Sequence, residues 1–168
     1  MAPRSGPTRL VERFEFLPED PGLVLGWLEH LGTARTGWAN FLPGVYDDDA
    51  LALEEPTGLF SIFSGARQPP VTMCTWVPPG GRKSEAEVVT IGVAHRQNRQ
   101  VVPVLTEAGV VVPTGWLVVQ DHVKRGLVLR VPQAVARQPV LSWLLDVGER
   151  LCLAPLTGSW QAEVHHPA

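Results

Sequence analysis

The chain has 168 residues, of which 45% are hydrophobic and 18% are charged, and its formal net charge is −3. A chain of this length forms one domain that buries about 70% of the surface exposed when unfolded, and its composition excludes disordered and fibrous classes. The basic residues are scattered, with the densest group at 96–99. Nucleic-acid binding is therefore disfavoured, because it depends on clustered cations that neutralise phosphates.

The beginning of the chain bears on its location. Residues 1–10 are polar and rich in Pro and Gly, and they lack the apolar segment of a secretory signal. No stretch approaches the 18 uninterrupted apolar residues of a spanning helix. We expect a cytoplasmic protein without a membrane partner, in which residues 1–8 are a disordered lead-in and residues 9–164 form a single domain.

The first expected elements are a strand and a helix. Phe14 and Phe16 alternate with polar residues in 11–17, which predicts a strand with one buried face. Asp20 can then cap a helix of roughly three turns. Its apolar stripe consists of Leu23, Trp27 and Leu31.

The middle of the chain is rich in strand signals. Residues 36–42 predict a second, weaker helix before this region. The strands are expected over residues 51–54, 58–64, 71–77, 87–95, 100–105, 110–112, 116–122 and 125–131. Their short spacing, with turn signals between them, is typical of an antiparallel meander rather than of βαβ units.

A longer helix is expected near the C-terminus. It begins near Pro139, which suits the first turn of a helix. Its apolar stripe consists of Val140, Leu144, Val147 and Leu151. Residues 157–164 add a last strand or cover a sheet edge, and residues 165–168 are expected to be frayed.

This order of elements predicts an α+β fold. We expect a curved antiparallel sheet of about six or seven strands, an N-terminal helix and a longer C-terminal helix. The order resembles the helix-grip arrangement of the START and Bet v1-like families, in which a curved antiparallel sheet grips a C-terminal helix. The resemblance lies in the architecture over most of the chain, and the segment after the last helix departs from it. A split barrel or another α+β roll is nearly as compatible with this order.

The search for motifs leaves no cofactor or metal assigned. The chain contains no dinucleotide, P-loop, zinc-protease or nucleophile-elbow motif. The acidic run 47–49 and the Gly-rich run 80–84 are interpreted as solvated turns. Cys74 and Cys152 are expected to be free thiols, because their separation excludes a CxxC pair and a reducing compartment is the default.

Three residues at strand ends are candidate catalytic groups. His95 ends one predicted strand, and Asp121 with His122 ends another. A histidine oriented by an aspartate is the usual general base, so the three side chains are able to act together if they meet at one rim of the sheet. Cys74 is disfavoured as a nucleophile because it lies in the middle of a strand.

Three of the six tryptophans are candidate contacts for a ligand or partner. Trp38, Trp76 and Trp116 lie near Gly or Pro at the ends of predicted elements. A large ring at such a place is suited to line a cavity mouth, and tryptophan is enriched at binding surfaces.

The sequence leaves three functions open. The first is a non-catalytic binding domain that holds a small apolar or aromatic ligand between the sheet and the C-terminal helix. The second is a protein-interaction or homo-oligomeric assembly module. The third is an enzyme that uses the histidines and aspartate at the strand ends.

Overall fold

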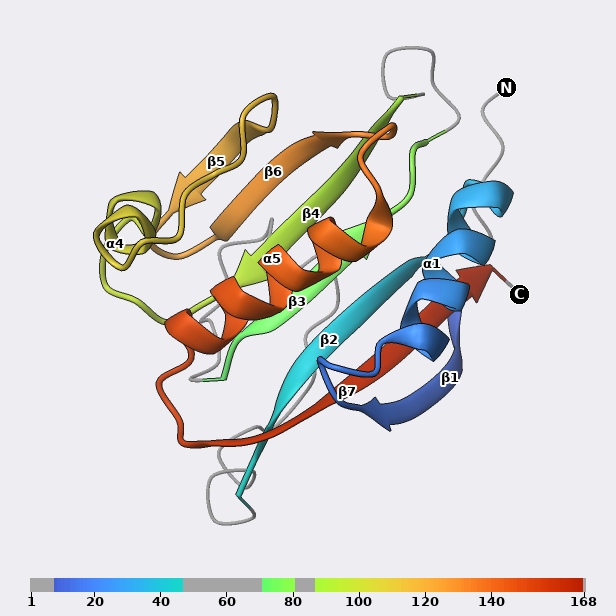
Figure 1. The fold of residues 1–168 in the computed structure, drawn as a ribbon, viewed down its shortest axis with the longest axis horizontal. Coiled ribbons are helices and arrows are strands. Elements are labelled where there is room, and N and C mark those ends of the chain that lie inside the picture. The colour runs from blue at the N-terminus through green and yellow to red at the C-terminus, as the bar shows by residue number, and fades with distance from the viewer. Residues whose placement is uncertain (1–7, 47–70, 81–86, 168) are drawn as a thin grey trace.

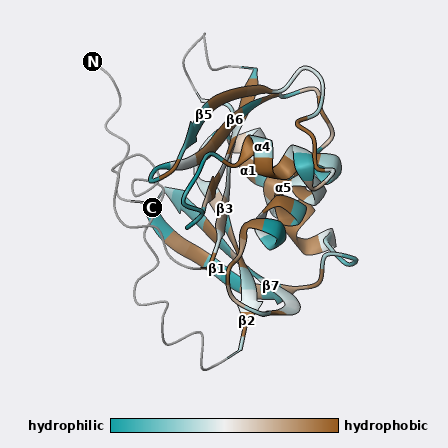
Figure 2. Cartoon of the chain, turned by 90° about the vertical axis from the view of Figure 1, so that its left-hand side faces the viewer, coloured by the Kyte–Doolittle hydropathy of each residue, from teal (hydrophilic) through white to brown (hydrophobic). Residues whose placement is uncertain are grey.

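The computed structural model describes residues 8–46, 71–80 and 87–167. Seven strands form one open antiparallel sheet in the order β1-β7-β2-β3-β4-β6-β5. The strands are β1 (Thr8–Phe16), β2 (Trp38–Val45), β3 (Met73–Val77), β4 (Val88–Ala94), β5 (Leu117–His122), β6 (Gly126–Pro132) and β7 (Leu156–Pro167). The helices are α1 (Gly22–Ala34), α4 (Val102–Glu107) and α5 (Arg137–Leu151). Helices α1 and α5 lie on the same face of the sheet (Figure 1), and the view from the side shows the same two layers (Figure 2).

This architecture confirms the predicted α+β class, with an antiparallel sheet and a helix near each end of the chain. The finer resemblance to a helix grip stays a prediction. Strand β7 follows α5 in the chain, lies between β1 and β2 in the sheet and pairs with both. The prediction of frayed residues was wrong for 165–167, because these residues belong to β7 and its pairing with β1 extends to Pro167.

The prediction of a helix over residues 36–42 was wrong. Most of this segment belongs to β2, which pairs with β7 on one side and β3 on the other. Ala39 and Phe41 are buried toward the helices as a result. A short apolar window does not distinguish a strand from a helix, and here the two neighbouring strands decide.

The prediction of strands over residues 100–105 and 110–112 was also wrong. Helix α4 begins within the first segment, and no strand forms in the second. The carboxylate of Asp121 accepts hydrogen bonds from the amides of Val101 and Val102, at 2.9 and 3.0 Å. These amides are at the start of α4 and lack partners within the helix. A carboxylate twenty residues away in sequence therefore satisfies them.

Other predicted strands correspond to observed ones, namely 71–77 with β3, 87–95 with β4, 116–122 with β5, 125–131 with β6 and 157–164 with β7. The predictions for residues 1–7, 47–49, 51–54, 58–64 and 81–84 lie outside the described residues.

The core lies between the sheet and α5, and the helix backbone closely approaches the strands. A Cβ atom on Gly148 would lie 2.6 Å from Sγ of Cys74 and 2.8 Å from Cη2 of Trp160. The hydroxyl of Thr72 donates a hydrogen bond to the carbonyl oxygen of Gly148 at 2.6 Å. Sγ of Cys74 donates another to the carbonyl oxygen of Leu144 at 3.3 Å. The backbone of α5 is therefore in direct contact with side chains of the sheet.

Candidate functional site

The candidate catalytic residues lie toward one end of the sheet. Val93 of β4 is opposite Leu127 of β6, which is opposite Asp121 of β5. His95 follows β4 and His122 ends β5, so all three candidates are near this rim. The strand register therefore places the three positions at one rim of the sheet, and a meeting of their side chains stays a prediction.

The hydrogen bonds of these candidates go to backbone groups. Asp121 binds the amides at the start of α4, as described above. Nδ1 of His122 accepts hydrogen bonds from the amides of Lys124 and Arg125, at 3.0 and 3.2 Å. Nδ1 of His95 accepts a hydrogen bond from the amide of Gln97 at 3.2 Å. These bonds stabilise turns and a helix start, and a catalytic role for the three residues stays a prediction.

Burial shifts the pKa values of two groups toward their uncharged forms. Desolvation lowers the pKa of His95, and the negative charge of Asp121 opposes this shift. Burial, with a smaller contribution from Cys152, raises the pKa of the Cys74 thiol. Both cysteines are free. A neutral, buried thiol is a poor nucleophile, so Cys74 acts as a small apolar residue of the core.

The three candidate tryptophans do not gather in one site. Trp76 is 1% exposed and belongs to the core between sheet and helices. Trp116 packs edge-on against Trp143, with ring centroids 5.3 Å apart. Trp38 stacks on His165, with centroids 4.8 Å apart and an interplanar angle of 12°. Any contact with a ligand or partner stays a prediction for each of them.

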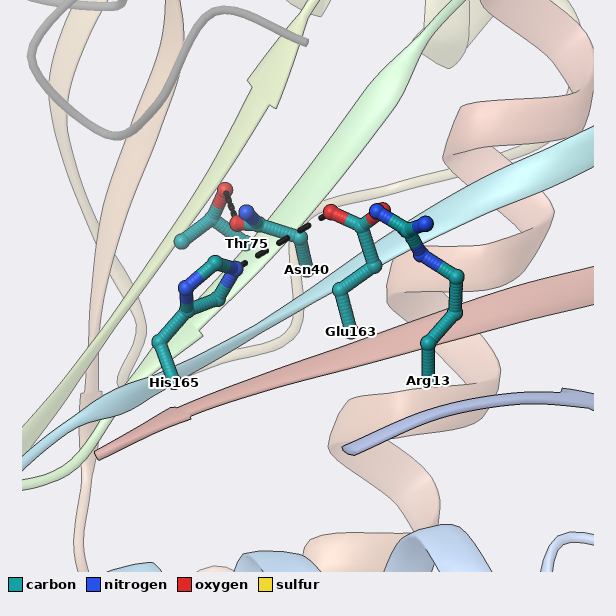
Figure 3. A network of polar contacts seen from close by, with 5 residues as sticks. All are labelled: Arg13, Asn40, Thr75, Glu163 and His165. Carbon is teal, nitrogen blue, oxygen red and sulfur yellow. Dashed lines mark hydrogen bonds and ion pairs between the residues drawn. The ribbon is translucent and has the colours of Figure 1, made fainter. Parts of the chain in front are cut away.

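A row of polar side chains crosses the face of the sheet that points away from the helices. The register aligns Arg13, Glu163, Asn40 and Thr75 on four neighbouring strands. Nε of Arg13 donates a hydrogen bond to Oε1 of Glu163 at 2.9 Å. Nη2 of Arg13 forms an ion pair with the same oxygen at 2.8 Å. The hydroxyl of Thr75 donates to Oδ1 of Asn40 at 2.9 Å. Figure 3 shows these side chains with His165, whose Nε2 is 3.9 Å from Oε2 of Glu163.

The charges in this row are partly balanced. The imidazole of His165 lowers the pKa of Glu163 most, burial raises it, and Arg13 lowers it again through its charge and hydrogen bond. The net result is a pKa below the ordinary value. The separation of 3.9 Å between Nε2 of His165 and Oε2 of Glu163 is too long for a hydrogen bond, so the contact that the geometry supports directly is the one with Arg13.

Two ring nitrogens beside this row are unsatisfied. Among the groups that the structure describes, Nε1 of Trp38 and Nε2 of His165 are buried and have no hydrogen-bond partner. A carboxylate and an imidazole exchange a proton when they lie within hydrogen-bond reach, and the 3.9 Å between Glu163 and His165 exceeds this reach. The sequence analysis missed this cluster, although Glu163 and His165 are two residues apart and share a strand face. The signal was present, but the strand was expected to end too early.

Replacing Glu163 with glutamine should make the free energy of unfolding less dependent on pH in the acidic range. Because the pKa of Glu163 is lowered on folding, its stabilising effect is present above the unfolded pKa of about 4.3 and disappears as pH falls through the folded value. Glu163→Gln should therefore lower the free energy of unfolding at pH 7 by about 1 kcal/mol, since Arg13 is half exposed and screened. In urea titrations, the difference from wild type should be smaller near pH 3 than at pH 7.

The matched control for this experiment is Glu15→Gln. Glu15 is exposed and lies on the same face of β1 as Arg13. It should change the free energy of unfolding little at either pH. A loss in Glu163→Gln that is equally large at pH 7 and near pH 3 would show that the carboxylate charge contributes nothing.

The two cavities that we describe lie outside the seam between sheet and α5. The first cavity, of about 160 Å³, lies between the β1–α1 connection and α5. Its lining consists of Pro18, Pro21, Gln138, Leu141, Ser142, Leu145, Asp146 and Glu149. A ligand between the sheet and α5, as expected from the sequence, would require the close contact at Gly148 to open. That hypothesis stays a prediction.

The second cavity is an open groove of about 310 Å³ on the surface of α1. We call it the α1 groove, and its lining consists of Gly22, Leu23, Gly26, Trp27 and His30. The stripe of α1 that is buried against the core contains Val24, Leu28 and Leu31. Leu23 and Trp27 were predicted on the buried stripe, but Leu23 is 56% exposed and Trp27 is only partly buried. The helix is therefore rotated relative to the expectation, which leaves two large apolar side chains in the groove.

Comparisons with known proteins add no assignment. No protein-family model matches the chain, and neither do curated proteins or solved structures. Among the described residues, no group of three or more His, Cys, Asp or Glu side chains is placed to hold a metal ion. No helix in the described ranges combines the length and the apolar character needed to cross a membrane.

Proposed function

We propose that this protein is a non-catalytic interaction module whose docking surface is the α1 groove. The observation that carries the proposal is Leu23, which is 56% exposed and lines an open groove beside the ring of Trp27. Surface helices of globular proteins normally turn their apolar side chains toward the core. A contiguous apolar patch that remains exposed marks a site of contact with another molecule, whereas single exposed apolar residues are common.

Two glycines support this interpretation. Gly22 and Gly26 are one turn apart and both line the α1 groove. A Cβ atom on Gly26 would meet no other atom within 4 Å. Glycine inside a helix is less favourable than alanine by about 1 kcal/mol, so the fold itself gains nothing from it. The open backbone gives an apolar side chain of a partner protein room to approach the helix closely.

The remaining parts of the proposal follow from the candidate groups. His95, Asp121 and His122 make hydrogen bonds with backbone groups, which favours a structural role over catalysis. The free thiols of Cys74 and Cys152 suit a reducing compartment. We therefore place this interaction module in the cytoplasm.

A peptide library tests the proposed docking surface. Peptides selected from a phage-displayed random library for binding to the wild-type protein should carry apolar anchors. Their affinity should fall at least about 10-fold for Leu23→Asp, because a carboxylate in the groove must be desolvated when an apolar anchor binds. Isothermal titration calorimetry measures this change.

The matched control is Leu153→Asp. Leu153 is also 56% exposed, and it lies in the connection between α5 and β7. Its replacement should leave peptide affinity unchanged. Equal losses in both variants, or none in either, would show that the α1 groove is not the docking surface.

A further inference from the structure

We infer that the partner of the α1 groove is a second copy of this chain, bound about a two-fold axis with the two α1 helices antiparallel. The inference rests on the proposed function, because it names the occupant of the same docking surface. Closed two-fold dimers are the commonest homo-oligomers, and their interface uses the same patch on both copies. Such a patch must be complementary to itself in shape and in its polar groups.

The α1 groove is complementary to itself in shape. Leu23 projects from the helix, with 56% of its surface exposed. Gly26, three residues further on, leaves open space where a side chain would otherwise stand. In an antiparallel pair, Leu23 of each copy lies over Gly26 of the other. The Leu23 side chains of both copies are then buried in one symmetric contact.

The groove also presents a hydrogen-bond acceptor at one end and a donor at the other. Oδ1 of Asp20 is 4.0 Å from the position that a Cβ atom on Gly22 would occupy, which places a carboxylate at the N-terminal end of the groove. The imidazole of His30 lies at the C-terminal end, with its ring 5.6 Å from that of Trp27. Both side chains are exposed.

The positions of these two groups select the antiparallel arrangement. Asp20 and His30 lie at nearly equal distances along the chain from the midpoint between Leu23 and Gly26. An antiparallel pair therefore sets the carboxylate of each copy against the imidazole of the other. A parallel pair brings the two carboxylates together, which is unfavourable for like charges.

The contact between the two helices is small. Helix α1 has 13 residues and is about 20 Å long. A pair of helices of this length falls in the range below about 1,200 Å² of buried surface, which is typical of transient complexes. The dimer is therefore weak and forms only as the protein concentration rises.

Sedimentation equilibrium over about 10 µM to about 1 mM tests the dimer. The wild-type protein should pass from monomer to dimer within this range. In the Gly26→Leu variant, the new side chain fills the space that Leu23 of the second copy would occupy. In the Leu23→Asp variant, a charged side chain replaces the apolar one. Each substitution should weaken the dimer at least 10-fold. Leu153→Asp should dimerise like the wild type. Leucine has a higher helix propensity than glycine, so Gly26→Leu should fold at least as well as the wild type in thermal melts.

Disulfide crosslinking tests the register. In a Cys152→Ser background, a mixture of Leu23→Cys and Gly26→Cys proteins, oxidised in air with copper phenanthroline, should form the mixed disulfide in preference to either homodimer. Cys74 is buried and does not compete. A parallel pair would favour homodimers of each variant instead, and that result would overturn the antiparallel arrangement.

The outcomes separate this inference from the proposed function. A wild-type protein that stays monomeric at about 1 mM overturns the dimer, whereas selected peptides that still lose affinity for Leu23→Asp keep the docking surface. A dimer that Gly26→Leu and Leu23→Asp leave unchanged has its interface elsewhere and also overturns the inference.

Discussion

Gly148→Ala should lower the free energy of unfolding by about 2 kcal/mol, because the added methyl group has no space between α5 and the sheet. Its Cβ atom would lie 2.6 Å from Sγ of Cys74 and 2.8 Å from the ring of Trp160. Overpacking of this kind forces shifts of side chains and backbone and typically costs about 1–3 kcal/mol. Urea unfolding followed by circular dichroism measures the loss.

The same substitution in α1 should have the opposite effect. Gly26→Ala meets no atom within 4 Å, and alanine is the more favourable helix residue by about 1 kcal/mol. At low protein concentration it should therefore raise the free energy of unfolding. If Gly148→Ala also raises the free energy of unfolding, α5 does not approach β3 and β7 as closely as these distances indicate.

Trp76→Ala should be the most damaging of the changes considered. Trp76 is 1% exposed and packs in the core between sheet and helices. Truncation of a buried tryptophan costs about 3–5 kcal/mol, a large part of the roughly 5–15 kcal/mol that stabilises a typical domain. Urea unfolding followed by circular dichroism measures this loss.

Trp116→Ala is the comparison for this experiment. Trp116 is partly exposed and packs on the core from outside, against Trp143. Its truncation should cost less than about 2 kcal/mol. Similar losses in the two variants would contradict the assignment of Trp76 to the core and of Trp116 to its margin.

The elements that the sequence predicted are those with strong local signals. The alternation in residues 71–77 and 125–131 indicates strands whatever their neighbours are. Residues 36–42 and 100–105 differ, because their structure depends on distant partners. The first pairs with β7, which comes from the end of the chain. The second begins a helix whose first amides bind Asp121.

The candidate docking surface was only half predictable. The sequence identified an amphipathic α1 with Leu23 and Trp27, but it assigned them to the buried stripe. Val24 and Leu28 form a second apolar stripe, at a different angle around the helix. Two such stripes leave the rotation of the helix undetermined until the sheet and α5 are in place. The core therefore takes one stripe, and the other lines the groove.

Chemical-shift mapping tests the central claim most directly. A selected peptide that binds the wild-type protein is titrated into ¹⁵N-labelled protein, and the amide and indole resonances are followed. The docking surface predicts that the largest shifts belong to Gly22, Gly26 and the indole of Trp27. Largest shifts at the exposed edge strand β5, for example at Leu117 and Val119, would contradict it.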